Sequence, residues 1–255
     1  MTFASGAAAF GSILLISGVF SMFGKGGGAL FTPVLLLLGM TVGPAVSTSL
    51  FLNLVTAAVA TVVFWRYGLV DFKFSAWFLP GTIVGSVAGS LLSSRAPQNL
   101  ILGVFAVFLY AAGVLMFLSP KESGEQITRP VNGRVLAVVT VFSFGVGLLS
   151  SLIGVGGGLM IFPFLLLYMR YGARKAAGAN AFIVMVSSFV GSASHFALGS
   201  VDPRFITVMA VACVGGSAIG SRVTVKASPA FIKVGFAVLL WFFAGQITLK
   251  LLGIV

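Results

Sequence analysis

Two glycine-rich runs hold the residues best suited to chemistry in this sequence. Gly24-Lys25-Gly26-Gly27-Gly28 is followed by Pro33, and Gly154-Val155-Gly156-Gly157-Gly158 is followed by Pro163. Adjacent glycines interrupt a helix and leave backbone N–H groups uncovered. The apolar segment after each run should be helical, so its first N–H groups point back at the loop with the positive end of the helix dipole. This combination predicts an anion-binding site built from both loops.

Small polar side chains follow each loop and are candidates to complete this site. They are Ser47, Thr48, Ser49 and Asn53 in the first half of the chain, and Asn180, Ser187 and Ser188 in the second. Neutral donors can hold a small oxyanion without the desolvation cost of an intramembrane charge. Such hydroxyls also commonly bond their own helix backbone, so the sequence leaves both interpretations open.

Lys25 and His195 are the titratable residues of the predicted site. Val155 occupies the place that matches Lys25. Lys25 therefore either supplies a counter-charge to the substrate or extends to the cytoplasmic interface. His195 stands where the first half has Phe64, and we favour a hydrogen-bonded histidine at the membrane rim over a proton carrier.

The acidic residues predict no metal or cofactor site. Asp71 and Asp202 each begin a helix and are interpreted as N-caps. Glu122 and Glu125 belong to a polar linker, so no carboxylate lies clearly within the membrane. Cys213 is the only cysteine, which excludes an internal disulfide. Anion binding by backbone and hydroxyl groups is the simpler hypothesis.

Composition predicts that the elements around these loops are membrane helices. Of 255 residues, 59% are hydrophobic and 7% are charged, whereas about a quarter are charged in soluble domains. The 15 Lys and Arg residues, against 4 Asp and Glu, lie mostly between apolar segments. There they anchor topology, so we expect a lipid bilayer and no nucleic acid as partner.

The chain reads as an all-α polytopic protein with two repeats of about 130 residues. Residues 1–118 form the first repeat, 119–134 a cytoplasmic linker and 135–255 the second repeat. Each repeat is expected to contain a helix broken at the glycine loop and three longer spans. The first repeat has apolar segments at Ala7–Phe23, Gly28–Gly39, Pro44–Phe64, Phe74–Leu92 and Leu100–Leu118. The second has them at Val135–Ile153, Gly158–Met169, Ala176–Phe196, Phe205–Ser221 and Phe231–Leu252.

Two further patterns bear on packing and orientation. Gly81, Gly85 and Gly89 recur at four-residue spacing, which favours close helix packing over binding. If each short segment returns to the side where the first segment began, nearly all basic residues fall on one face. The exceptions are Arg95, Arg204 and Lys250, joined by Lys25 if the loop ends inside the membrane. The positive-inside rule thus favours inverted halves with both termini outside the cytoplasm.

The doubled pattern S-x-x-G-x-G-G-G-x-x-x-x-P resembles the TauE/SafE family of sulfite exporters. Here it runs from Ser21 to Pro33 and, with Val155 between its first two glycines, from Ser151 to Pro163; the stretch Ser194–Asp202 also looks like the family. The resemblance covers essentially the whole chain. It implies a permease of the bacterial inner membrane for sulfite or sulfonates such as sulfoacetate. The chain departs from the pattern at Lys25, where the family more often has an apolar residue.

We therefore expect a transporter, most simply an exporter, that closes its two glycine loops around a small anion in the middle of the membrane. This hypothesis requires a cavity that reaches the glycines. The alternatives are a structural or assembly subunit of a membrane complex, or an importer of a related anion such as thiosulfate; a homodimer stays open. An enzyme is not expected, because H-E-x-x-H and G-x-S-x-G motifs are absent and the chain has one histidine.

Overall fold

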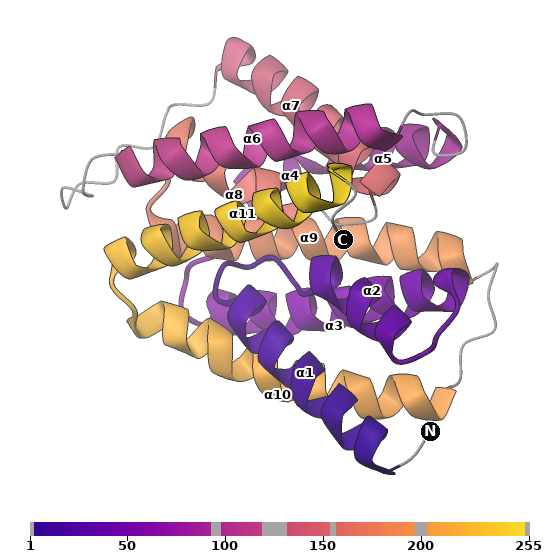
Figure 1. Ribbon diagram of the computed structural model, residues 1–255. Coiled ribbons are helices and arrows are strands. Elements are labelled where there is room, and N and C mark those ends of the chain that lie inside the picture. The colour runs from indigo at the N-terminus through magenta and orange to yellow at the C-terminus, as the bar shows by residue number, and fades with distance from the viewer. Residues whose placement is uncertain (1–2, 93–97, 119–131, 154–156, 197–202, 253–255) are drawn as a thin grey trace.

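A computed structural model describes residues 3–92, 98–118, 132–153, 157–196 and 203–252, and every regular element in these ranges is a helix (Figure 1). The first half contains α1 (Phe3–Ser21), α2 (Gly28–Leu37), α3 (Val42–Arg66), α4 (Phe72–Ala76), α5 (Leu79–Leu92) and α6 (Gln98–Leu118). The second contains α7 (Gly133–Ile153), α8 (Gly158–Leu167), α9 (Ala173–Phe196), α10 (Pro203–Lys226) and α11 (Pro229–Leu251).

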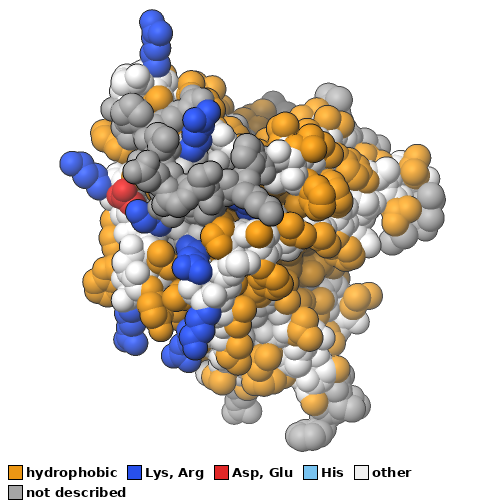
Figure 2. Space-filling view, turned by 90° about the vertical axis from the view of Figure 1, so that its left-hand side faces the viewer, with side chains coloured by type: hydrophobic (Ala, Val, Ile, Leu, Met, Phe, Trp, Pro, Cys, Tyr) orange, Lys and Arg blue, Asp and Glu red, His pale blue; other side chains and the backbone are white. Residues whose placement is uncertain are grey.

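The chain is a multi-pass membrane protein. Within the described ranges, five helices are long and apolar enough to cross a bilayer: α3, α7, α9, α10 and α11. Further apolar helices are shorter, and α2 and α8 have ten residues each. Lys and Arg side chains gather on one side of the molecule and apolar side chains cover much of the rest of the visible face, as Figure 2 shows. This distribution is the one that a bilayer imposes.

Helices α3 and α9 pack on each other in the centre (Figure 1). Around them the contacts are reciprocal: α1 packs on α10, and its counterpart α7 packs on α5, the counterpart of α10. The pair α6 and α11 also packs together. The first helix of each half of the chain thus packs on a helix of the other half, so the two halves cannot separate without exposing their contact surfaces.

Glycine makes the pairing of α5 with α7 close, as the sequence predicted. A side chain at Gly81 or Gly85 would overlap the backbone of α7. In the corresponding pair, side chains at Gly216 and Gly220 of α10 would overlap the backbone of α1. The packing interpretation of Gly81 and Gly85 is confirmed, because without a Cβ the two backbones approach closely enough to touch.

The span expected at Phe74–Leu92 is divided into α4 and α5. Asp71 caps α4, since its Oδ1 accepts the Phe74 N–H at 2.9 Å. Pro80 lies in the first turn of α5 and has no N–H to continue a helix from α4. The cap predicted at Asp71 is confirmed, whereas Asp202 lies outside the described residues.

Candidate functional site

The first glycine loop turns the chain between α1 and α2 through two residues with positive φ. Gly24 and Gly26 have φ of 63° and 71°, the left-handed region that glycine enters without strain. The Lys25 N–H donates to the Phe20 carbonyl at 3.2 Å, and the Gly24 N–H donates to the Ser21 carbonyl at 3.0 Å. These two bonds form the Schellman pattern that ends many helices, so Gly24 is the cap of α1.

The start of α2 is held by two polar side chains of α3. The Gly28 N–H donates to Asn53 Oδ1 at 2.8 Å, and Ser49 Oγ donates to the Gly28 carbonyl at 3.1 Å. A side chain at Gly26 would overlap the Asn53 oxygen, so glycine there lets the amide approach. The N–H at the head of α2 is occupied in this conformation, and an anion at that point would have to replace the Asn53 oxygen.

The start of α8 is held in a corresponding way from α9. Asn180, which matches Ser49 in position, donates through Nδ2 to the Gly158 carbonyl at 3.2 Å. The same amide donates to the Phe23 carbonyl of the first loop at 2.9 Å. Asn180 therefore connects the turn after α1 to the start of α8, while its own Oδ1 is buried without a hydrogen-bond partner.

The remaining polar side chains named from the sequence have different roles. Asn53 Nδ2 donates to Ser188 Oγ at 2.6 Å, which joins α3 to α9 across the two repeats. Ser187 bonds the Val184 carbonyl of its own helix at 3.1 Å. Thr48 Oγ1 is buried without a hydrogen-bond partner, and Ser47 is buried beside it on α3. The structure thus brings Ser49, Asn53 and Ser188 together at the start of α2. It places Asn180 at the start of α8 and gives Ser187 a purely local bond.

Lys25 is the one basic side chain that the described structure encloses. It is 2% exposed, and its Nζ has no hydrogen-bond partner. Instead, Nζ lies 4.5 Å from the ring centre of Phe20 and 4.6 Å from that of Phe243, within cation–π range of both. The stem passes the start of α8 so closely that a Cβ on Gly158 would lie 2.8 Å from Lys25 Cγ. In this conformation the Lys25 side chain therefore does not extend to the cytoplasmic interface, which was one of the two interpretations from the sequence.

The amino group of Lys25 lies deep in the bundle. Its neighbour Phe243 is 14 residues after Pro229 and 8 before Leu251, which is about 21 Å and about 12 Å along the helix at 1.5 Å per residue. A hydrocarbon core is about 30 Å thick. Lys25 thus places an amino group without a hydrogen-bond partner deep among the membrane helices, where ionisable groups usually serve a ligand or an ion path.

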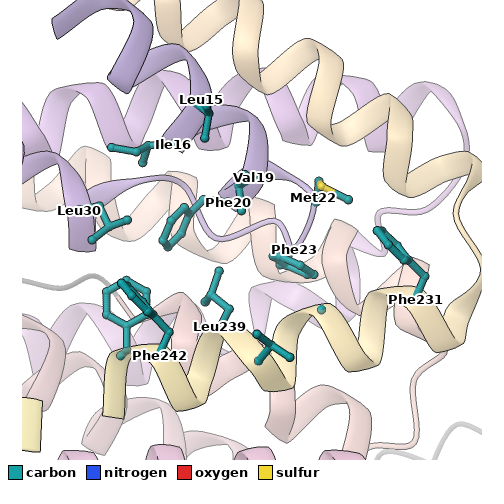
Figure 3. A pocket seen from close by; sticks show the side chains of 13 residues that line it. Leu15, Ile16, Val19, Phe20, Met22, Phe23, Leu30, Phe231, Leu239 and Phe242 are labelled. Carbon is teal, nitrogen blue, oxygen red and sulfur yellow. The ribbon is translucent and has the colours of Figure 1, made fainter. Parts of the chain in front are cut away.

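An apolar groove of about 440 Å³ lies between α1, α2 and α11, next to this cation. Its lining includes Leu15 and Val19 of α1, Phe23 of the loop, Leu30 of α2 and Leu239 of α11. Figure 3 shows Phe20 and Leu239 pointing toward one another across it. Gly24, Gly26, Gly27 and Gly28 of the first loop are buried and do not line this groove. The cavity that the anion hypothesis requires at the glycines is therefore not provided by the groove in this conformation.

Several predicted site residues are not described. Gly154 and Gly156 lie outside the described residues; His195 belongs to α9, but its side chain lies outside the described ones. Gly157 and Gly158 are buried at the start of α8, where a Cβ on Gly157 would lie 2.7 Å from a Val146 methyl group. In the described part of the chain, no three His, Cys, Asp or Glu side chains are grouped to hold a metal ion.

Sequence reasoning missed the aromatic partners of Lys25. Phe20 and Phe243 are ordinary residues for apolar helices, so neither carries a signal of its own; the signal was the basic residue without a counterpart in the other repeat. It also missed a contact between repeats on the basic side, where Tyr171 donates to Asp71 Oδ2 at 3.3 Å. Burial, and then the Asp71 carboxylate, raise the pKa of Tyr171, so it remains a donor.

Comparison with known proteins identifies relatives over nearly the whole chain. A family model described as "Sulfite exporter TauE/SafE" matches residues 9–247. The chain is 26% identical over 241 residues to "Probable membrane transporter protein YunE" of Bacillus subtilis, covering 83% of this chain and 86% of the relative. It is 24% identical over 234 residues to "Probable membrane transporter protein MJ0441" of Methanocaldococcus jannaschii, covering 84% of each. No solved structure matches the chain.

Proposed function

This chain belongs to the TauE/SafE family, and we propose that it carries small sulfur-containing anions, such as sulfite or sulfonates, across the bacterial inner membrane. The relatives are named membrane transporters, and the family name supplies the substrate class. The proposal adds the site: the anion binds beside Lys25, between the first glycine loop and the start of α8.

The observation that carries the proposal is the buried amino group without a partner. A buried amino group without a partner carries a positive charge only at a high cost in free energy, and an anion beside Lys25 offsets that cost. The surrounding groups suit a small oxyanion, because Thr48 has a hydroxyl without a partner and the starts of α2 and α8 direct positive dipole ends toward the loops. A ligand without negative charge would leave the amino group uncompensated.

Two oppositely oriented repeats, meeting at the loops, give such a site a means of alternating access. The reciprocal packing of α1 on α10 and α7 on α5 supports related halves, and the distribution of basic residues supports opposite orientation with both termini outside. Gly28 bonds Asn53 near the middle of α3, which supports a loop that ends inside the membrane. Paired broken helices of this kind form central sites in several transporter folds.

We assign the described conformation to a closed state of the cycle. Gly24–Gly28 are buried, and the Asn53–Ser188 and Asn180–Phe23 bonds hold α3, α9 and the first loop together. Opening toward either side must break some of these bonds or move the loops with them.

Flux of sulfite into proteoliposomes tests the proposal. We expect the wild-type protein to carry sulfite and short sulfonates, and Lys25→Met to lose at least about tenfold in flux, a loss equivalent to about 1.4 kcal/mol. Lys73→Met is the matched control, because Lys73 is exposed on α4. Full flux in Lys25→Met, or none in the wild type for any of these anions, would contradict the proposal.

The same vesicles decide direction and the remaining alternatives. A membrane that is negative inside favours anion export by about 2.3 kcal/mol per charge per 100 mV, so an imposed potential should drive flux toward the positive side. Flux of thiosulfate in the opposite direction, coupled to another ion, would favour the importer. A structural subunit would give no flux of any tested anion.

A further inference from the structure

The side-chain amide of Asn180 is buried on α9, and its two polar atoms are in different situations. Nδ2 donates to the Phe23 carbonyl at 2.9 Å and to the Gly158 carbonyl at 3.2 Å, whereas Oδ1 has no hydrogen-bond partner. Exchanging the two ends would put the amide oxygen against two carbonyl oxygens, so these contacts fix the orientation of the amide. Asn180 therefore presents an unpaired acceptor in the interior of the protein.

Asn53, the buried amide at the start of α2, has partners for both of its ends. Its Oδ1 accepts the Gly28 N–H at 2.8 Å, and its Nδ2 donates to Ser188 Oγ at 2.6 Å. Nearly all buried polar atoms in proteins are paired, because an unpaired one forgoes the hydrogen bonds that it would make with water. Since the fold satisfies both ends of Asn53, the unpaired oxygen of Asn180 indicates a ligand.

The hydrogen-bond partners of Asn180 lie on both sides of the Lys25 stem. Phe23 precedes Lys25 by two residues in the first loop. A Cβ on Gly158 would lie 2.8 Å from Lys25 Cγ and 2.9 Å from a methyl group of Val184, which is one turn after Asn180 on α9. Lys25 Nζ also lacks a hydrogen-bond partner. A side chain with an unpaired donor and one with an unpaired acceptor thus meet around the start of α8.

These two side chains make different demands on one ligand. A fully ionised oxyanion has acceptors only, so it can pair with the amino group of Lys25 but places an oxygen against Asn180 Oδ1. A singly protonated oxyanion satisfies both side chains. Its O–H donates to Asn180, while its other oxygens accept from Lys25. Two facing acceptors are especially unfavourable here, because buried surroundings provide little water to separate them.

We propose that Asn180 is a specificity-determining residue whose Oδ1 accepts the O–H of a singly protonated oxyanion, so that the protein selects bisulfite over fully ionised sulfite. This inference rests on the proposed function and identifies the protonation state in which the same site takes its substrate. A site that hydrogen-bonds a hydroxyl of its substrate discriminates strongly against an analogue without that hydroxyl.

Two anions of the same shape test the inference. At slightly acidic pH, methylphosphonate and methanesulfonate are both monoanions of nearly equal size, but only methylphosphonate keeps an O–H. Inhibition of sulfite flux by each is measured in proteoliposomes. We expect methylphosphonate to inhibit at a concentration at least about tenfold lower, a preference equivalent to about 1.4 kcal/mol. Equal inhibition, or stronger inhibition by methanesulfonate, would overturn the inference.

Asn180→Ala removes the acceptor and should abolish the preference between the two anions. Because the change also removes the bonds to the Phe23 and Gly158 carbonyls, the unfolding midpoint is measured beside the flux. Ser187→Ala is the matched control on the same helix, since the Ser187 hydroxyl bonds the Val184 carbonyl one turn before it. It should keep the wild-type preference. If Asn180→Ala does not fold, the comparison of the two anions in the wild type decides.

The outcomes separate this inference from the proposed function. No sulfite flux in the wild type overturns the proposed function itself. Sulfite flux without a preference for methylphosphonate overturns only the selection of a protonated anion. A preference that persists unchanged in folded Asn180→Ala shows that another group reads the O–H, and it overturns the role of Asn180.

Discussion

The two short helices after the glycine loops share their pattern but not their surroundings. In α8 every residue is buried except Phe164 and Leu167, which are partly exposed. In α2 only Gly28, Phe31 and Leu35 are buried, and Leu37 is almost fully exposed. α8 packs against α6, α7 and α9. α2 packs mainly against α3, and its Leu30 lines the groove.

This difference indicates that α2 and α8, which share a sequence pattern, have different roles. The second copy is a packed scaffold, because its aromatic residues fill the space beside α6 and α7. The first copy carries the lysine, lies beside the groove and has fewer neighbours to restrain it. We expect motion and ligand contact to be concentrated in the first copy, and the following predictions can break or sharpen that view.

The sharpest test uses two leucines at the same place in the two short helices. Leu166 is 8% exposed and Leu36 is 39% exposed. Leu166→Ala should destabilise the protein by about 2–4 kcal/mol, because it leaves a cavity in a packed region. Leu36→Ala should cost less than about 1 kcal/mol, since lipid or solvent replaces the lost contacts. Unfolding in mixed micelles measures both; equal costs would contradict the scaffold interpretation.

The second test concerns the sign of a stability change. Lys25→Met removes a buried amino group without a hydrogen-bond partner and keeps much of the apolar stem, so the protein should gain on the order of 1–3 kcal/mol in stability while losing flux. Thermal denaturation in nanodiscs measures the gain, with Lys73→Met as the exposed control. A stability loss in Lys25→Met would show that the contacts with Phe20 and Phe243 outweigh burial of the charge.

The third test removes the amide that holds the start of α2. Asn53→Ala leaves the Gly28 N–H and the Ser188 hydroxyl without their partner, and a buried unsatisfied group costs about 1–3 kcal/mol. Ser188→Ala removes only the link to α9 and should cost less. Hydrogen exchange should show faster opening of α2 than of α8 in Asn53→Ala. Equal acceleration in both helices would mean that Asn53 supports the whole bundle.

The smallest effect is expected at the contact between repeats on the basic side. Tyr171→Phe removes the hydrogen bond to Asp71 and keeps the ring stacked on Phe74. A hydrogen bond to a charged group contributes about 1.5–3 kcal/mol, but Asp71 is exposed, and screening by solvent should reduce the contribution to less than about 1 kcal/mol. The unfolding midpoint measures it. A larger loss of stability would indicate that the Tyr171–Asp71 hydrogen bond is needed to hold the closed state.

The local features of the fold could be predicted from the sequence because they depend on near neighbours. Gly24 ends α1, Asp71 caps α4, and Gly81 and Gly85 allow close packing; each follows from backbone geometry or side-chain size. The break between α4 and α5 was not predicted, although Pro80 carried the signal. The segment from Phe74 to Leu92 is apolar throughout, so it was interpreted as one span although Pro80 lacks the N–H that a continuous helix needs.

The candidate site was only partly predictable. The sequence brought forward Asn53, Asn180 and Ser188, but it could not say that they bond across the repeats or occupy the loop backbone. It gave two readings of Lys25, and the described conformation excludes one of them. Predicted residues at Gly154, Gly156 and His195 stay predictions, since the structure does not describe their surroundings.

Composition, periodicity and repetition alone determined that this chain is a helical membrane protein with a duplicated, glycine-broken helix. Those properties depend on how each segment meets lipid and on which residues a turn tolerates. Only the tertiary structure decided that Phe20 and Phe243, near opposite ends of the chain, enclose Lys25, and that one copy of the short helix borders a groove while the other is packed. The bilayer solvates all apolar side chains in much the same way. Which side chains contact each other is therefore decided only when the helices pack together.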